Sequence, residues 1–172
     1  MSYQSGEVVL YGSEGICTVL GTEEKRFGQE ALMYYVLESK NKGSRIFVPF
    51  ANKNLIDRIR TPLSDVEFKN LLADFLGKDD FPWIENERER KSYNMSLVSN
   101  GSAEDLLVLM KTIQNRRRML EEMGKKLYAH DDRSYREART LVLAEMTISL
   151  QIDTQEAEQI LVSAWDAFRL AE

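Results

Sequence analysis

The chain has 172 residues, of which 43% are hydrophobic and 30% are charged, and its formal net charge is −5. This composition is typical of a folded water-soluble protein with one ordinary domain or two small ones. No segment approaches the about 18 apolar residues of a membrane-spanning helix, and the first residues lack a signal-peptide pattern. We therefore expect a cytoplasmic protein without membrane contact. A single cysteine and a single histidine predict no internal disulfide and no metal site.

Short apolar runs separated by turn residues fill residues 1–60, which is typical of a small, strongly bent sheet or barrel. Gly21–Gly28 is expected to be a charged connection. The strand ending at Pro49 is predicted to lie at an edge, since proline cannot donate to a strand ladder. The alternative is an ordinary strand paired on both sides. The predicted strands are Glu7–Tyr11, Ile16–Leu20, Leu32–Leu37, Arg45–Pro49 and Leu55–Ile59.

From Thr61 onward the pattern becomes helical. Ser64 has the position of a helix N-cap, with Glu67 at the capping-box position, and a Gly- and Pro-containing break follows. We therefore predict a helical linker over 61–82 and an all-helical domain over 83–172, with Trp165 in its core. Further helices are expected from about Ile84 to Val98, after an N-cap at Ser102, from about Tyr135 to Leu150, and after an N-cap at Asp153 or Thr154.

Basic residues gather in the segment 111–139, although the whole chain is acidic. Arg133, Arg136 and Arg139 fall near one helical face, and Lys125 and Lys126 come just before that helix. Such side chains contact DNA phosphates and release counterions. The alternative is a solvated surface with local ion pairs.

Two further features bear on function. Trp83 follows Pro82 in the break between the predicted domains, where an aromatic ring can insert beside a base step. The alternative is a hinge tryptophan packed between the domains. The cluster of His130, Asp131 and Asp132 suggests a hydrolase, but helix capping explains it more simply, and no nucleophile, metal set or phosphate loop joins it. We therefore predict that the protein is not an enzyme and has no cofactor or small-molecule substrate.

Four segments, taken in their order and spacing, carry a resemblance to a known family. They are Gly6–Cys17, Tyr34–Leu37, Ile46–Pro49 and Gly124–Arg133, and Ala138, Arg139 and Glu145 follow at similar positions. The chain resembles the CarD family of bacterial transcription regulators over nearly its whole length, particularly the members from clostridia-like bacteria.

The resemblance implies an α+β fold, in which a Tudor-like N-terminal β-barrel, residues 1–60, adds its sheet edge to the RNA polymerase β subunit. It also implies that the C-terminal helical domain binds promoter DNA at the upstream edge of the transcription bubble, with weak sequence preference and with Trp83 as a minor-groove wedge. The alternative is a protein-interaction module that does not bind DNA, as the acidic net charge favours. The residues expected to bind polymerase are Arg45, Ile46, Phe47 and Val48. Those expected to bind DNA are Trp83, Arg88, Arg90, Lys125, Lys126, Arg133, Arg136 and Arg139.

Overall fold

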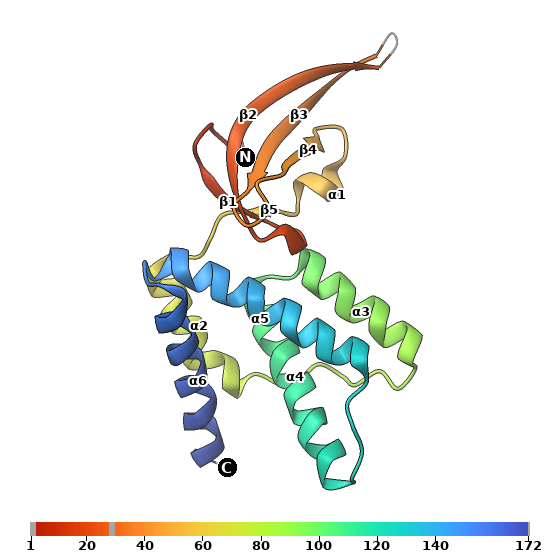
Figure 1. The fold of residues 1–172 in the computed structure, drawn as a ribbon, viewed down its shortest axis with the longest axis vertical. Helices are drawn as coiled ribbons and strands as arrows, with labels where there is room; N and C mark the ends of the chain where they lie inside the picture. Colours follow the sequence, from red (N-terminus) through yellow and green to blue (C-terminus); the bar gives the residue numbers. More distant parts are fainter. Residues whose placement is uncertain (1–2, 28–29, 172) are drawn as a thin grey trace. The chain divides into compact units, whose positions relative to one another are not determined.

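The computed structural model describes residues 3–27 and 30–171. The chain divides into two compact units, Met1–Pro62 and Leu63–Glu172. The first unit is built mainly of β-strands and the second of helices (Figure 1). The predicted α+β fold, with a β region followed by a helical region, is confirmed.

The β unit is a five-stranded antiparallel sheet with the order β4-β3-β2-β1-β5. Among the described strands, β4 and β5 each have one neighbour, so the sheet is open and the expected barrel is not closed. The elements are β1 (Val8–Tyr11), the 3₁₀ turn η1 (Gly12–Glu14), β2 (Ile16–Phe27), β3 (Glu30–Ser39), β4 (Arg45–Pro49), the short helix α1 (Lys53–Ile56) and β5 (Ile59–Arg60).

Strands β2 and β3 form a long hairpin that continues beyond the rest of the sheet (Figure 1). Their pairing runs to Phe27 opposite Glu30, with an irregularity between Val19 and Gly21. The expected connection over 21–28 is therefore wrong as far as residue 27, and residue 28 lies outside the described residues. A two-stranded ribbon with solvent on both sides needs no apolar alternation, so its charged sequence resembled a loop.

The core of the β unit lies on one face of the sheet. Burial raises the pKa of the Cys17 thiol to about 11, as expected for a small apolar core residue rather than a nucleophile. The strand expected over Leu55–Ile59 is replaced by α1, whose N-cap Asn52 accepts a hydrogen bond from the Leu55 amide at 3.2 Å, and by the two-residue strand β5. The buried residues of this core cluster are Val9, Cys17, Val19, Tyr35, Leu37, Val48 and Ile59.

The helical unit packs its helices around one apolar core. Phe68 and Phe75, from the segment expected to be a linker, are fully buried in that core. Trp165 packs edge-on against Phe75 with ring centroids 5.2 Å apart, which confirms its predicted core position. The elements are α2 (Asp65–Asp74), η2 (Phe75–Gly77), α3 (Glu87–Asn100), α4 (Ala103–Glu122), α5 (Ala129–Ser149) and α6 (Thr154–Ala171).

Side-chain caps define where these helices begin. The Ser64 hydroxyl accepts from the Glu67 amide and the Glu67 carboxylate accepts from the Ser64 amide, so the predicted capping box is confirmed. Ser102 is the N-cap of α4, as predicted, and it also forms a capping box with Asp105. Asp153 accepts from the Glu156 amide at 2.8 Å at the start of α6. Each cap satisfies backbone donors that the first turn of a helix leaves without partners.

Candidate interaction surfaces

Strand β4 forms one edge of the sheet, as predicted for Arg45–Pro49. Two hydrogen bonds fix which of its backbone groups face β3: Ser39 N donates to Ser44 O at 3.0 Å, and Phe50 N donates to Met33 O at 2.9 Å. In an antiparallel pair the hydrogen-bonded positions alternate along the strand. Ile46 and Val48 therefore bond to β3.

By the same alternation, the amide and carbonyl groups of Arg45 and Phe47 point away from the sheet. The outward carbonyl of Pro49 accepts a hydrogen bond from Asn52 N at 3.1 Å, and proline has no amide hydrogen. The backbone available to an added strand is thus concentrated at Arg45 and Phe47. An exposed edge of this kind can pair with a strand of another protein.

The side chains of β4 divide between the two faces of the sheet. Val48 is fully buried and Ile46 packs against the same core. Phe47 lies on the opposite face, where the Lys25 amino group stands 3.1 Å from its ring centroid and the Tyr34 ring packs edge-on at 6.4 Å. Phe47 therefore presents a half-buried aromatic surface beside the open edge.

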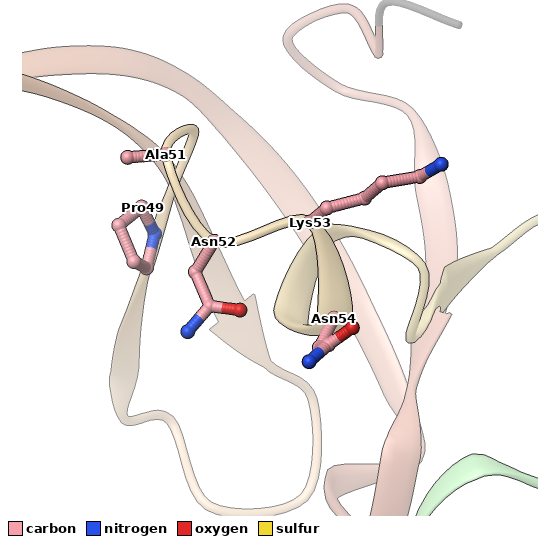
Figure 2. A pocket seen from close by; sticks show the side chains of 5 residues that line it. All are labelled: Pro49, Ala51, Asn52, Lys53 and Asn54. Atoms are coloured by element: carbon pink, nitrogen blue, oxygen red, sulfur yellow. The ribbon is translucent and has the colours of Figure 1, made fainter.

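A shallow, open hollow of about 360 Å³ lies at the end of β4, lined by Pro49, Ala51, Asn52, Lys53 and Asn54 (Figure 2). Figure 2 shows the side chains of Asn52 and Asn54 pointing to the same side, while Lys53 extends away from them. The residues that line the hollow lie at the end of the exposed edge strand and directly after it in the chain. It extends the candidate binding surface with amide groups that can donate or accept hydrogen bonds.

In the helical unit, Trp83 lies in the segment 78–86 that joins η2 to α3. Its ring is partly buried, and the guanidinium carbons of Arg90 and Arg116 lie 4.5 and 5.0 Å from its centroid. These distances are within the range of cation–π attraction. The cavity beside the ring is only about 10 Å³, room for no more than one water molecule.

Helix α4 fixes the first half of this segment. Lys111 Nζ donates to the Lys78 carbonyl and lies 3.3 Å from the Asp80 carboxylate. The Thr112 hydroxyl accepts from Phe81 N at 2.9 Å. Trp83 is therefore carried by a well-packed backbone segment.

Arg90 does not fit its predicted role as a DNA contact. Only 3% of the residue is exposed, and its Nε lies 3.1 and 3.2 Å from the two oxygens of Asp131. A buried guanidinium that is committed to a carboxylate cannot reach a phosphate. The prediction failed because its acidic partner is 41 positions away in the sequence.

The basic residues of α5 lie on the surface but are paired with acids. Arg133 pairs with Glu137 at 2.8 Å, Arg136 with Asp132 at 3.0 Å, and Arg139 with Glu158 at 3.2 Å. Exposed pairs of this kind exchange partners at little cost, because most contribute under about 1 kcal/mol. By contrast, no ion pair is recorded among the described residues for the exposed cations Arg88, Lys125 and Lys126.

The β unit matches a known family of protein domains. Residues 3–60 match the CarD-like/TRCF RID domain. No curated protein matches the chain. The match covers the β unit and supports a CarD-like domain there.

The CarD-like/TRCF RID match contains the whole of β4 and its hydrogen-bonded neighbours, so the open edge belongs to the matched domain. This domain is a protein-interaction domain. An interaction through a sheet edge agrees with the geometry of β4. The β subunit as the partner and the clostridia-like branch stay predictions.

The cluster of His130, Asp131 and Asp132, which suggested a hydrolase, forms a network of ion pairs and hydrogen bonds. Asp131 is fully buried and accepts from Arg90 and from Asn94 Nδ2, the latter at 3.1 Å. His130 Nε2 lies 3.1 Å from the same carboxylate. Within residues 3–27 and 30–171 no group of acidic, histidine or cysteine side chains is arranged to hold a metal ion, and no helix could cross a membrane.

Proposed function

We propose that this protein is a transcription regulator that binds the RNA polymerase β subunit through β4 and promoter DNA through its helical unit. The DNA contact would lie near the upstream edge of the transcription bubble and would alter the stability of the open complex. The observation that carries the proposal is the match of residues 3–60 to a polymerase-interacting domain whose sheet has an open edge.

Strand addition supports the polymerase contact. The outward backbone groups of Arg45 and Phe47 can pair with a strand of the β subunit, and the Phe47 ring adds apolar contact area beside that pairing. Main-chain bonds of this kind supply affinity, while neighbouring side chains supply specificity. All four residues proposed to bind polymerase, Arg45 to Val48, lie in this edge strand.

The DNA contact is proposed for Trp83 together with the exposed cations of the helical unit. A partly exposed ring on a well-packed segment can insert beside an unstacked base step, where its energy is realised only on distorted DNA. Phosphate contacts from nearby cations would hold the unit on the duplex with weak sequence preference. The proposed phosphate contacts are Arg88, Lys125, Lys126, Arg133, Arg136 and Arg139.

The mechanism is tethering. Binding to polymerase would raise the local concentration of the helical unit at the promoter, so a weak DNA contact becomes effective. This is how an acidic chain can act on DNA, because the polymerase contact compensates for its unfavourable net charge of −5.

The test of the proposal is Trp83→Ala. We expect a stability loss of about 1–2 kcal/mol, because two cation–π contacts are lost but the ring is not in the core. Polymerase affinity should be unchanged, while the open-complex lifetime should fall by about fivefold or more. Thermal unfolding, polymerase binding and promoter-complex decay are measured on the same variant, with Trp165→Phe as the control. An unchanged lifetime at full occupancy of polymerase would contradict the DNA contact.

A second candidate function is a protein-interaction module that does not touch DNA. The ion pairing of Arg133, Arg136 and Arg139 favours it, since these side chains already have acidic partners. Fluorescence anisotropy of the full chain on labelled DNA at several salt concentrations separates the two functions. Binding that weakens steeply with salt favours the DNA-binding function, and absence of binding, both alone and on polymerase, favours the second.

A further inference from the structure

We propose that Arg90 is a positioning residue, whose buried guanidinium fixes the backbone and ring of Trp83 for contact with DNA. The proposal rests on the DNA contact proposed above for Trp83. It assigns to Arg90 a role that does not require the side chain to reach DNA itself.

Arg90 contacts the segment that carries Trp83 in two ways, through its backbone and through the indole ring. Its Nη1 donates to the carbonyl of Ile84 at 2.6 Å and lies 3.2 Å from that of Glu85. Its guanidinium carbon lies 4.5 Å from the centroid of the Trp83 ring. One rigid planar group therefore holds both the backbone after Trp83 and the orientation of the indole.

The position of the guanidinium is itself fixed from α5. The Asp131 carboxylate accepts from Arg90 Nε through both oxygens. The Asn94 side-chain amide donates to the same carboxylate, and His130 Nε2 lies 3.1 Å from it. Arg90 Nη2 also lies 3.5 Å from His130 Nε2. Because Asp131 is fully buried and lies in the first turn of α5, the chain of contacts ties Trp83 to a long helix of the core.

Stability alone does not explain why a charged pair occupies this site. Replacing a buried ion pair with apolar residues of similar volume is often neutral or stabilising. Apolar residues, however, could not donate to the carbonyls of Ile84 and Glu85. Lysine could keep the charge but has a single nitrogen and no planar face. It therefore could not bind the Asp131 carboxylate, donate to the backbone carbonyls and stack on the Trp83 ring at the same time. The requirement for arginine therefore comes from the geometry around Trp83.

The experiment uses Trp165→Phe as the parent, so that Trp83 is the only tryptophan. The indole nitrogen of Trp165 is buried with no hydrogen-bond partner, so phenylalanine loses no polar contact there. Time-resolved fluorescence anisotropy of Trp83 is recorded for the full chain with Arg90→Lys. This variant keeps a positive charge beside Asp131 and so keeps that carboxylate compensated.

The matched control is Arg117→Lys. Arg117 also pairs with an aspartate at the start of α5, Asp132 at 2.8 Å, and stacks over a ring, that of Tyr135 at 4.9 Å. It has no recorded contact with the segment 78–86 among the described residues. Both substitutions therefore remove a guanidinium that pairs with an aspartate and stacks on a ring, although the Arg117 pair is partly exposed where the Arg90 pair is buried, and only Arg90→Lys should act on Trp83.

We expect Arg90→Lys to give Trp83 a fast local rotation on the nanosecond scale that the parent and Arg117→Lys lack. The open-complex lifetime should fall by about fivefold or more, toward the Trp83→Ala value. A Trp83 fluorescence anisotropy decay and an open-complex lifetime that both equal those of the parent would overturn the proposal. If Arg90→Lys does not fold, Arg90→Met with Asp131→Leu, which removes both charges of the pair together, is measured in the same way and is expected to give Trp83 the same local rotation.

Failure of the DNA contact is distinguishable from failure of the positioning role. If Trp83 gains local motion but neither Arg90→Lys nor Trp83→Ala changes the open-complex lifetime, the DNA contact is wrong and Arg90 orders the segment for another purpose. If Trp83→Ala shortens the lifetime but Arg90→Lys changes neither the motion nor the lifetime, the positioning role is wrong and the DNA contact stands.

Discussion

Substituting proline into the edge strand tests the binding surface at the level of single backbone groups. The amide of Arg45 points away from β3, whereas the amide of Ile46 bonds to Leu37 in the ladder. Arg45→Pro should therefore remove an outward donor without breaking the sheet, because edge strands accept proline where the amide faces solvent. Ile46→Pro should break a ladder bond inside the fold.

The expected magnitudes follow from one hydrogen bond in each case. Loss of the outward amide of Arg45 should weaken polymerase binding by about 0.5–1.5 kcal/mol, which is roughly 2- to 12-fold in Kd. Loss of the inward amide of Ile46 leaves the Leu37 carbonyl without its partner and should lower the free energy of unfolding by about 1–3 kcal/mol. The first variant should be defective in binding and the second in folding.

The assay is equilibrium binding of the full chain to RNA polymerase, with thermal unfolding of the same samples. Arg45→Ala is the control, because it removes the exposed side chain and keeps the amide. Equal affinity for Arg45→Pro and Arg45→Ala would refute strand addition at this edge. A melting temperature of Arg45→Pro as low as that of Ile46→Pro would refute the assignment of inward and outward groups.

Three further predictions concern surface charge, the buried thiol and a helix cap. Replacing the exposed Lys125 and Lys126 with glutamate should weaken binding to unrelated DNA sequences, and each lost phosphate contact should flatten the slope of log K against log salt by about one; an unchanged slope contradicts their role. Because burial raises the pKa of Cys17 to about 11, its thiol should be protonated at pH 7.5 and react with iodoacetamide only on unfolding, as mass spectrometry can check. Hydrogen bonds from Ser64 lower the pKa of Glu67, so this carboxylate stabilises the fold above its unfolded-state pKa, and the contribution disappears as pH falls through the folded-state pKa. Ser64→Ala should therefore raise the pKa of Glu67 in an NMR titration and weaken the acid dependence of stability; an unchanged pKa would contradict the capping role.

The elements that were predicted well have signals within a few residues. Strand β4 was predicted with its observed bounds, because the turn before it and Pro49 at its end punctuate the sequence. The capping box at Ser64 and the N-cap at Ser102 likewise depend on residues within one helical turn. Local chemistry of this kind fixes element boundaries without knowledge of the tertiary fold.

The features that were missed depend on distant partners or on the absence of burial. The extension of β2 to Phe27 has no apolar period because both its faces are solvated. Helix α5 begins at Ala129, although the sequence predicted this helix only from about Tyr135. There Asp131 is buried by its contact with Arg90, and this same distant pairing removed Arg90 from the DNA-binding set.

The most direct test of polymerase binding by β4 is site-specific photo-crosslinking within a polymerase–promoter complex. A photoreactive amino acid replaces Arg45, which is exposed at the open edge, and Val66, which is 64% exposed on α2, serves as the comparison site. We predict crosslinks from position 45 to the β subunit and none to it from position 66. Crosslinks from position 45 to another subunit, or none at all from a chain bound to polymerase, would contradict the account.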